Sequence, residues 1–165
     1  MLKSPYLKDN RLADVLAALQ VMALSSEYRM SCKGWAYKIS GDEGRSDYWR
    51  TIFDEHQEFF RRSTAEDNYA LIWRRASPRR YNVETHEFIT DVEFDALPTK
   101  EKLKIIRPPV PESQIKTLMD MAINLHGKAI ESSRDWRWWI APALSFGGSF
   151  LGALMAFTAA ALFKR

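Results

Sequence analysis

The stretch that decides the fold is residues 46–75, SDYWRTIFDEHQEFFRRSTAEDNYALIWRR, because its side-chain pattern changes period part-way along. The first third predicts a helix, since Trp49, Ile52, Phe53 and His56 recur three and four positions apart on one face. Ser46 belongs to the residue types that cap helix N-termini, so we expect the helix to start there.

The remainder of this stretch predicts a β-hairpin. Residues 59–63 and 69–75 are rich in aromatic and branched side chains, and the polar residues 64–68 between them are typical of a turn. In the returning strand, alternation places Leu71 and Trp73 on one face. Ala70, Ile72 and Arg74 then lie on the opposite face.

Upstream, the sequence predicts two further helices and a short extended piece. Asp9 and Asn10 are N-cap types ahead of a helix over residues 10–24, whose apolar positions are Leu12, Val15, Leu16, Leu19 and Met22. Residues 28–30 predict a short extended piece. Ser31 can cap a second helix, which carries Trp35, Ala36 and Ile39 and ends at the pair Ser40–Gly41.

The order is therefore helix, short strand, helix, helix and hairpin. Over about residues 8–80 this order and size resemble winged helix-turn-helix domains, and the resemblance rests on no specific motif. It implies an α+β fold, mainly α with a small β-hairpin, for a soluble domain over residues 1–87. An irregular α+β domain built from the same elements is the alternative.

Residues 88–111 predict an irregular linker that contains proline. Thr90 and Glu93 form a capping-box pattern, Thr99 can cap a second short helix through Lys104, and residues 107–111 are expected to be extended as a polyproline II spacer. An amphipathic helix follows over residues 112–135. Its apolar positions fit either a short coiled-coil seam or packing on the chain's own domain or a membrane surface: Ile115, Leu118, Ala122, Leu125 and Ala129.

The C-terminal part, residues 136–165, predicts a membrane anchor. Residues 138–163 contain no charge and are long enough to span a bilayer as a helix. Side chains suited to the membrane interface flank this stretch: Trp136, Arg137, Trp138, Trp139, Lys164 and Arg165. With two residues after the span and no apolar N-terminal signal, we expect a single-pass tail anchor, in contact with membrane lipid, and a cytoplasmic N-terminal domain.

Small residues within this stretch recur every four positions, at Gly148, Gly152, Ala156 and Ala160. This spacing lets two helix backbones approach closely in lipid, so it predicts a possible homodimer through the transmembrane and juxtamembrane helices. The alternative is that Gly and Ala are simply common in membrane spans.

The sequence offers little for catalysis. It contains one cysteine, Cys32, which excludes an intramolecular disulfide, and we interpret this residue as a buried small side chain. The three histidines have no metal-ligand spacing, and the polar run 54–58 is interpreted as a solvated helix face. Phosphate-binding and nucleophile motifs are absent. We therefore expect no enzyme and no cofactor or metal.

Arginines concentrate between residues 45 and 80, where there are eight and no lysine. They and two aromatic neighbours are the candidate contacts for a partner: Arg45, Tyr48, Trp49, Arg50, Arg61, Arg62, Arg74, Arg75, Arg79 and Arg80. Arginine binds phosphate and guanine well, which favours nucleic acid. However, six acidic residues share this stretch, and residues 1–87 carry 14 Lys and Arg against 13 Asp and Glu. This balance favours local ion pairs among the surface arginines or an acidic protein partner. We therefore expect a non-enzymatic membrane adaptor, with a membrane-tethered nucleic-acid binder as the alternative.

Overall fold

The computed structural model describes residues 4–63 and 67–138, and in residues 135–138 it describes the backbone only. The fold is mixed α+β, as the sequence predicts. The chain divides into two compact units, Met1–Leu125 and His126–Arg165. Of the second unit the structure describes a continuous helical segment, residues 126–138.

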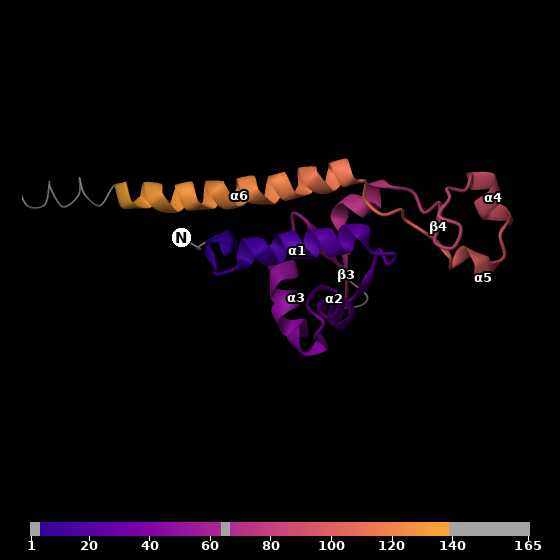
Figure 1. Cartoon of the computed structure of the whole chain (residues 1–165), viewed down its shortest axis with the longest axis horizontal. Helices are drawn as coiled ribbons and strands as arrows, with labels where there is room; N and C mark the ends of the chain where they lie inside the picture. The colour runs from indigo at the N-terminus through magenta and orange to yellow at the C-terminus, as the bar shows by residue number, and fades with distance from the viewer. Residues whose placement is uncertain (1–3, 64–66, 139–165) are drawn as a thin grey trace, which may run out of the picture. The chain divides into compact units, whose positions relative to one another are not determined.

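Three helices and a small antiparallel sheet form the N-terminal part (Figure 1). In chain order the elements are η1 (Pro5–Leu7), α1 (Arg11–Leu24), β1 (Met30–Ser31), α2 (Cys32–Ser40), η2 (Glu43–Arg45), α3 (Ser46–Glu55), β2 (Phe60–Arg62), β3 (Asn68–Leu71) and η3 (Ile72–Ala76), where η marks a 3-10 helix. The strand order is β1-β3-β2, so β3 is central, with Met30 opposite Tyr69 and Phe60 opposite Leu71.

The predicted helix ends are right in part. The Ser31 side chain accepts a hydrogen bond from the Gly34 amide at 3.2 Å, which confirms its capping role. Gly41 ends α2 in the left-handed conformation at φ 73°, where glycine carries no steric penalty. By contrast, Asn10 makes no side-chain cap, and Ser46 is the first residue of α3 rather than its cap.

The core forms where the apolar faces of the three helices meet the sheet. Phe53 of α3 lies with its ring centroid 5.0 Å from those of both Phe60 and Tyr69. The indole of Trp35 donates a hydrogen bond to the Tyr69 carbonyl oxygen at 2.9 Å, so α2 is fixed to β3. Burying each apolar side chain of this size stabilises the folded state by about 1.5–3 kcal/mol relative to leaving it exposed.

The returning strand is shorter than the sequence predicts. It ends at Leu71, and residues 72–76 form the 3-10 helix η3, so the predicted alternation of Trp73 and Arg74 is wrong. The physical reason lies at Arg74, whose side chain turns inward and donates hydrogen bonds to carbonyl oxygens at the end of α1. Hydrogen bonding to another part of the chain outweighs local strand preference here.

The predicted linker contains regular structure. Strands β4 (Tyr81–Asn82) and β5 (Ile105–Ile106) pair as a two-stranded antiparallel sheet. Helices α4 (Asp91–Ala96) and α5 (Thr99–Lys102) lie between these strands in the sequence. The predicted capping box of α4 is confirmed in both of its hydrogen bonds. The helix predicted to run through Lys104 ends at Lys102, and Thr99 does not cap it with its side chain. The sequence did not indicate the strand pair.

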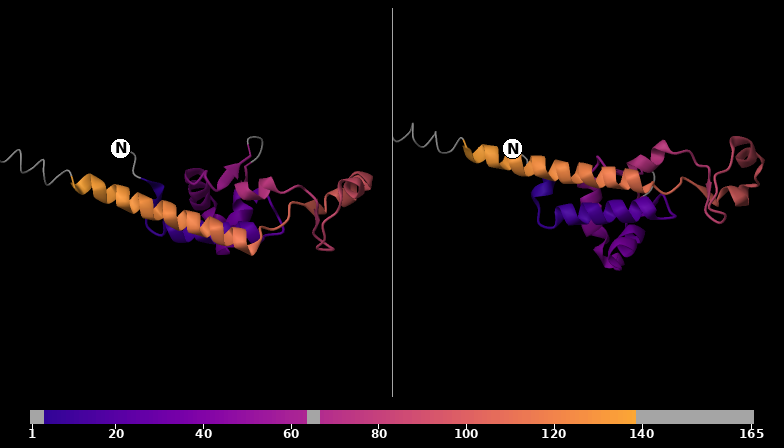
Figure 2. Two further views of the ribbon diagram at one scale, coloured as in Figure 1. Left: turned by 90° about the horizontal axis from the view of Figure 1, so that it is seen from above. Right: turned by 45° about the horizontal axis from the view of Figure 1, so that its top comes forward.

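Helix α6 (Glu112–Trp138) packs on the N-terminal part through its first half. Figures 1 and 2 show this half, up to Leu125, running antiparallel beside α1. Ile115, Leu118 and Ala122 are buried there, and the Val110 amide donates to the Ala23 carbonyl oxygen at 3.0 Å. Three positions of the predicted coiled-coil seam therefore pack on the chain's own domain, which was the alternative interpretation.

The predicted membrane anchor lies outside the described residues. Neither segment that the structure describes, 4–63 or 67–138, contains a helix with the length and apolar character needed to cross a membrane. Trp139, Lys164 and Arg165, and the small residues Gly148, Gly152, Ala156 and Ala160, are not described, and neither are the side chains of Trp136, Arg137 and Trp138. The membrane anchor stays a prediction.

Candidate interaction surface

The candidate contacts that come together lie where α3 meets the β2–β3 hairpin. We call this the α3–hairpin surface and define it by its accessible side chains: Asp47, Arg50, Thr51, Asp54, Arg62 and Asp67. At its centre, Arg50 donates two hydrogen bonds to Asp67, one of them to Oδ2 at 2.6 Å. The Nη2 atom of Arg62 lies 3.1 Å from the Asp67 Oδ1 atom, so two guanidinium groups share one carboxylate.

Two further carboxylates lie on the same surface. Asp47 Oδ1 is 3.7 Å from Arg50 Nε, and Asp54 Oδ1 accepts a hydrogen bond from the Tyr69 hydroxyl at 2.8 Å. The hydrogen bond from Arg50 lowers the pKa of Asp67, and burial followed by the bond to Asp54 raises the pKa of Tyr69. Asp67 therefore lies between two guanidinium groups, with Asp47 beside Arg50 and Asp54 beside Tyr69.

Two aromatic candidates at the start of α3 have different environments. The Arg45 guanidinium lies 4.6 Å from the ring centroid of Tyr48, which is exposed and donates a hydrogen bond to Asp14. Trp49 is only 2% exposed, and its indole donates to Ser40 Oγ at 3.2 Å. The prediction that Trp49 contacts a partner is wrong, because its position on the apolar face of α3 places it in the core.

Arg74 is also a core residue, which corrects its assignment as a partner contact. It is 1% exposed, and its Nη1 atom donates to the carbonyl oxygens of Met22, Ser25 and Glu27 at 2.7–3.2 Å. Its Nη2 atom donates to the Arg107 carbonyl oxygen at 2.8 Å. Carbonyls at a helix C-terminus lack partners within the helix and favour a cation. Burial lowers the pKa of Arg74 to about 10, which leaves it charged at neutral pH.

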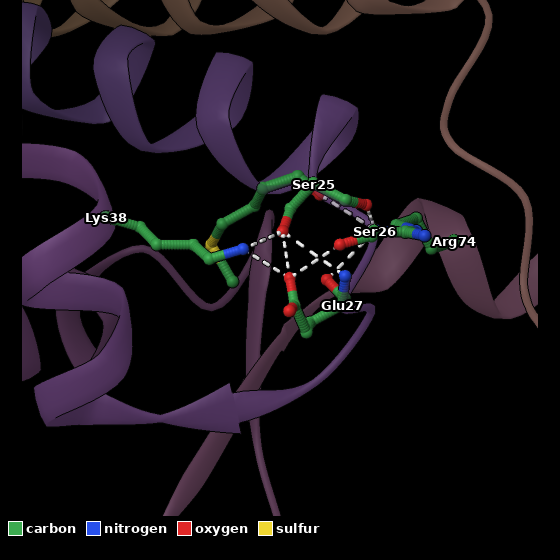
Figure 3. A network of polar contacts seen from close by, with 6 residues as sticks. Ser25, Ser26, Glu27, Lys38 and Arg74 are labelled. Atoms are coloured by element: carbon green, nitrogen blue, oxygen red, sulfur yellow. Dashed lines mark hydrogen bonds and ion pairs between the residues drawn. The ribbon is translucent and has the colours of Figure 1, made fainter. Parts of the chain in front are cut away.

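A polar network of side chains lies beside Arg74 at the end of α1 and centres on Glu27 (Figure 3). Glu27 Oε2 accepts hydrogen bonds from the Ser25 and Ser26 hydroxyls, both at 2.9 Å, and from the Lys38 ammonium. The bond from Lys38 is the largest cause that lowers the pKa of Glu27 to about 2. Sequence reasoning missed this network, although the run Ser-Ser-Glu directly after a helix could have indicated it.

The remaining arginine candidates are not brought together with Arg50. Arg79 donates to the Lys102 and Ile105 carbonyl oxygens, and Arg80 pairs with Asp91 and lies 4.3 Å from the Phe94 ring centroid. These contacts hold residues 77–106 together. Two of the candidate arginines, Arg61 and Arg75, are exposed, and no side chain in the described ranges pairs with either of them.

A second polar cluster, unforeseen in the sequence, lies under η1. His56 is fully buried, with Nδ1 3.0 Å from Glu58 Oε1 and its ring centroid 4.4 Å from that of Tyr6. The Tyr6 hydroxyl donates to the same Glu58 oxygen at 2.7 Å, and Arg11 Nη2 lies 2.9 Å from Glu55 Oε2. The prediction of a solvated face over residues 54–58 is therefore wrong at His56.

Neither histidine nor cysteine chemistry suggests a reactive centre in the described part. Within residues 4–63 and 67–138, no group of three or more His, Cys, Asp or Glu side chains could hold a metal ion. Cys32 is buried, as the sequence predicts, and its thiol donates to the Ser46 carbonyl oxygen at 3.0 Å. Burial raises the pKa of this thiol to about 11, so it stays protonated and weakly nucleophilic.

Comparison of the chain with protein-family models, with curated proteins and with solved structures found no match. Its function must therefore be inferred from the surface described above.

Proposed function

We propose that the chain is a non-enzymatic membrane adaptor whose N-terminal winged-helix-like domain binds a protein partner through the α3–hairpin surface. The element order α1-β1-α2-α3-β2-β3 and the sheet order β1-β3-β2 support the winged-helix assignment. In that assignment α3 corresponds to the recognition helix and the β2–β3 hairpin to the wing.

The charge arrangement around Arg50 is the observation that carries this proposal. A nucleic-acid backbone presents closely spaced negative charges, and each must meet a cation or be repelled. On the α3–hairpin surface, the carboxyl groups of Asp47, Asp54 and Asp67 would face those negative charges. In addition, Arg50 and Arg62 already form ion pairs with Asp67. A protein can match such a mixed pattern of charges residue by residue, whereas a uniform polyanion cannot.

The alternative is a membrane-tethered nucleic-acid binder. It is favoured by the two exposed arginines, Arg61 and Arg75, whose guanidinium groups are available for phosphates. If this function applies, affinity for duplex DNA will fall steeply with salt, and a charge reversal such as Arg61→Glu will reduce the salt slope by about one unit.

Site-specific photo-crosslinking in native membranes tests the partner class. A photoreactive residue at Thr51, exposed on α3, should capture a protein that is identified by mass spectrometry, because Thr51 lies within the proposed surface. The same residue at Gln20, exposed on α1, is the matched control and should not capture that protein. Crosslinks from Thr51 to nucleic acid would instead support the alternative.

We also propose that residues 138–163 attach the chain to the membrane, on the basis of their uncharged length. A chain truncated before Trp136 should remain in the supernatant when membranes are pelleted, whereas the full chain should pellet with them. If the truncated chain still pellets after a high-salt wash, helix α6 is a second attachment site, and the proposal that residues 138–163 act alone is wrong.

Self-association through the anchor is a separate part of the proposal. Replacing Gly148 and Gly152 with Ile should weaken association in a membrane two-hybrid assay, because bulkier side chains separate closely packed helices. Replacing two leucines of the same stretch, Leu151 and Leu154, with Ile is the matched control. An unchanged signal in the glycine variant would contradict a homodimer formed through these residues.

A further inference from the structure

We propose that the α3–hairpin surface recognises the carboxylate of a single Asp or Glu side chain in the partner, at the position that Asp67 fills in the isolated chain. This inference rests on the proposed function, because it specifies the chemistry of the protein partner. In the isolated chain, Asp67 would then act as an internal competitor that the partner must displace.

The geometry at Asp67 is that of a carboxylate-binding site. Arg50 approaches it with both terminal nitrogens, and Arg62 approaches it from the neighbouring strand with one. Planar guanidinium groups match the two oxygens of a carboxylate, and this match gives directional as well as electrostatic selectivity. The two arginines therefore form a site for one carboxylate group.

The site is exposed enough for a carboxylate of the partner to replace Asp67. The Asp67 side chain is 43% exposed, Arg50 is 31% exposed and Arg62 is 52% exposed, so a partner can reach all three. Ion pairs at such exposure contribute little to stability, which means that replacing Asp67 by another carboxylate costs little.

Both arginines have a second support that does not involve Asp67. Arg50 Nε lies 3.7 Å from Asp47 Oδ1 on the same helix, and the Arg62 guanidinium lies 6.0 Å from the Tyr69 ring centroid. These contacts keep the two guanidinium groups near their present positions when Asp67 leaves. A site held in this way loses less conformational entropy on binding.

The surroundings favour a single acidic side chain of a protein over a nucleic acid. Asp47 and Asp54 flank the site and repel a chain of regularly spaced phosphates. A single glutamate or aspartate from a partner places one carboxylate between the arginines, and polar neighbours in the partner can meet the flanking acids.

The test uses the full chain in non-ionic detergent and a fluorescent glutamine peptide with one central glutamate, the single-glutamate peptide, with an oligoglutamine peptide as the neutral probe. Asp67→Asn should tighten binding of the single-glutamate peptide severalfold, because the competing carboxylate is lost. Arg50→Gln should abolish the binding. Arg50→Lys should also weaken it severalfold, since an ammonium keeps the charge and loses the two-pronged geometry.

Asp91→Asn is the matched control, because it changes the net charge equally and releases Arg80 elsewhere in the chain. It should leave binding of the single-glutamate peptide unchanged. An equal gain from Asp91→Asn, or wild-type binding by Arg50→Lys, would mean that only overall charge matters and would overturn the inference. So would a gain by Asp67→Asn for duplex DNA alone.

The failure of this inference can be told apart from failure of the proposed function. If the single-glutamate peptide binds no variant while Thr51 still crosslinks to a protein, the partner uses the α3–hairpin surface through other chemistry. In that case the adaptor proposal stands and the carboxylate inference is wrong.

Discussion

Arg74 and Arg50 belong to one arginine-rich stretch of sequence, yet they occupy opposite environments. Arg74 lies in the core and donates to four main-chain carbonyl oxygens from two separate parts of the chain. Arg50 lies on the α3–hairpin surface and pairs with the side chain of Asp67. Burial and partner type, rather than clustering in sequence, separate a structural arginine from one that is available to a partner.

The two environments differ in what the loss of the arginine would leave behind. Removing a buried cation strands its hydrogen-bond acceptors away from water, which costs the full desolvation of each acceptor. Removing one member of an exposed pair leaves groups that water solvates at once. The comparison therefore predicts a large effect on stability at Arg74 and a small one at Arg50.

The largest expected effect is at Arg74. Arg74→Ala should lower the free energy of unfolding by about 3–5 kcal/mol, because buried carbonyls at the end of α1 lose their donor. Urea denaturation of the full chain, followed by circular dichroism, measures this loss. Arg75→Ala, at the exposed neighbouring position, is the control and should change stability by less than about 0.5 kcal/mol. Equal losses of unfolding free energy in Arg74→Ala and Arg75→Ala would contradict the distinction between a buried and an exposed arginine.

Much of the N-terminal fold could be predicted from local sequence patterns. Helical periodicity indicated α1, α2 and α3, and the ends at Ser31 and Gly41 followed from capping chemistry. These features depend on neighbouring residues, so the sequence carries them directly. The end of the hairpin at Leu71 could not be predicted, because it depends on carbonyl groups about 50 positions upstream, which Arg74 binds.

The residue types of the candidate site could be predicted from the sequence, but some of the residues predicted to belong to it do not. The sequence identified Arg50 and Arg62 as candidate contacts, but nothing local indicated that Asp67, 17 positions from Arg50, would join them. Trp49 and Arg74 were misassigned because an aromatic or charged side chain can be buried as well as exposed. Only the packing of α3 and η3 distinguishes these cases.

The second prediction extends the comparison to another buried polar side chain, His56. His56→Ala should lower the free energy of unfolding by about 2 kcal/mol, because it opens a cavity beside Tyr6 and removes the contact with Glu58. Thermal denaturation measures the loss. Gln20→Ala, an exposed change on α1, should be nearly neutral, and a similar loss in that control would argue against a specific role for the buried histidine.

The third prediction concerns the network beside Arg74 and has a defined pH window. Glu27 has a pKa of about 2 in the folded chain against an ordinary value near 4.5, so its contribution to stability is complete above pH 4.5. The contribution is lost as the pH falls from 4.5 to 2, because the unfolded chain binds the proton first. Since Glu27 is 45% exposed, solvent screening reduces this contribution to about 1 kcal/mol.

Unfolding curves at several pH values test this sign. Glu27→Gln should be less stable than the wild type at pH 7 by about 1 kcal/mol, and the difference should vanish near pH 2. Ser26→Ala removes one of the weaker donors to Glu27 and should show a smaller change of the same sign. A difference that grows as the pH falls would contradict the direction of the pKa shift.

The smallest expected effect on stability lies on the α3–hairpin surface and completes the comparison. Asp67→Asn and Arg50→Gln should each change the free energy of unfolding by less than about 1 kcal/mol, because both partners are partly exposed. The same two variants should change binding of the single-glutamate peptide in opposite directions, with a severalfold gain for Asp67→Asn and a loss of binding for Arg50→Gln. A small stability change together with a large binding change separates an interaction site from a structural ion pair. If Arg50→Gln instead destabilises the chain as much as Arg74→Ala does, Arg50 belongs with the structural arginines, and the surface would lose its central contact.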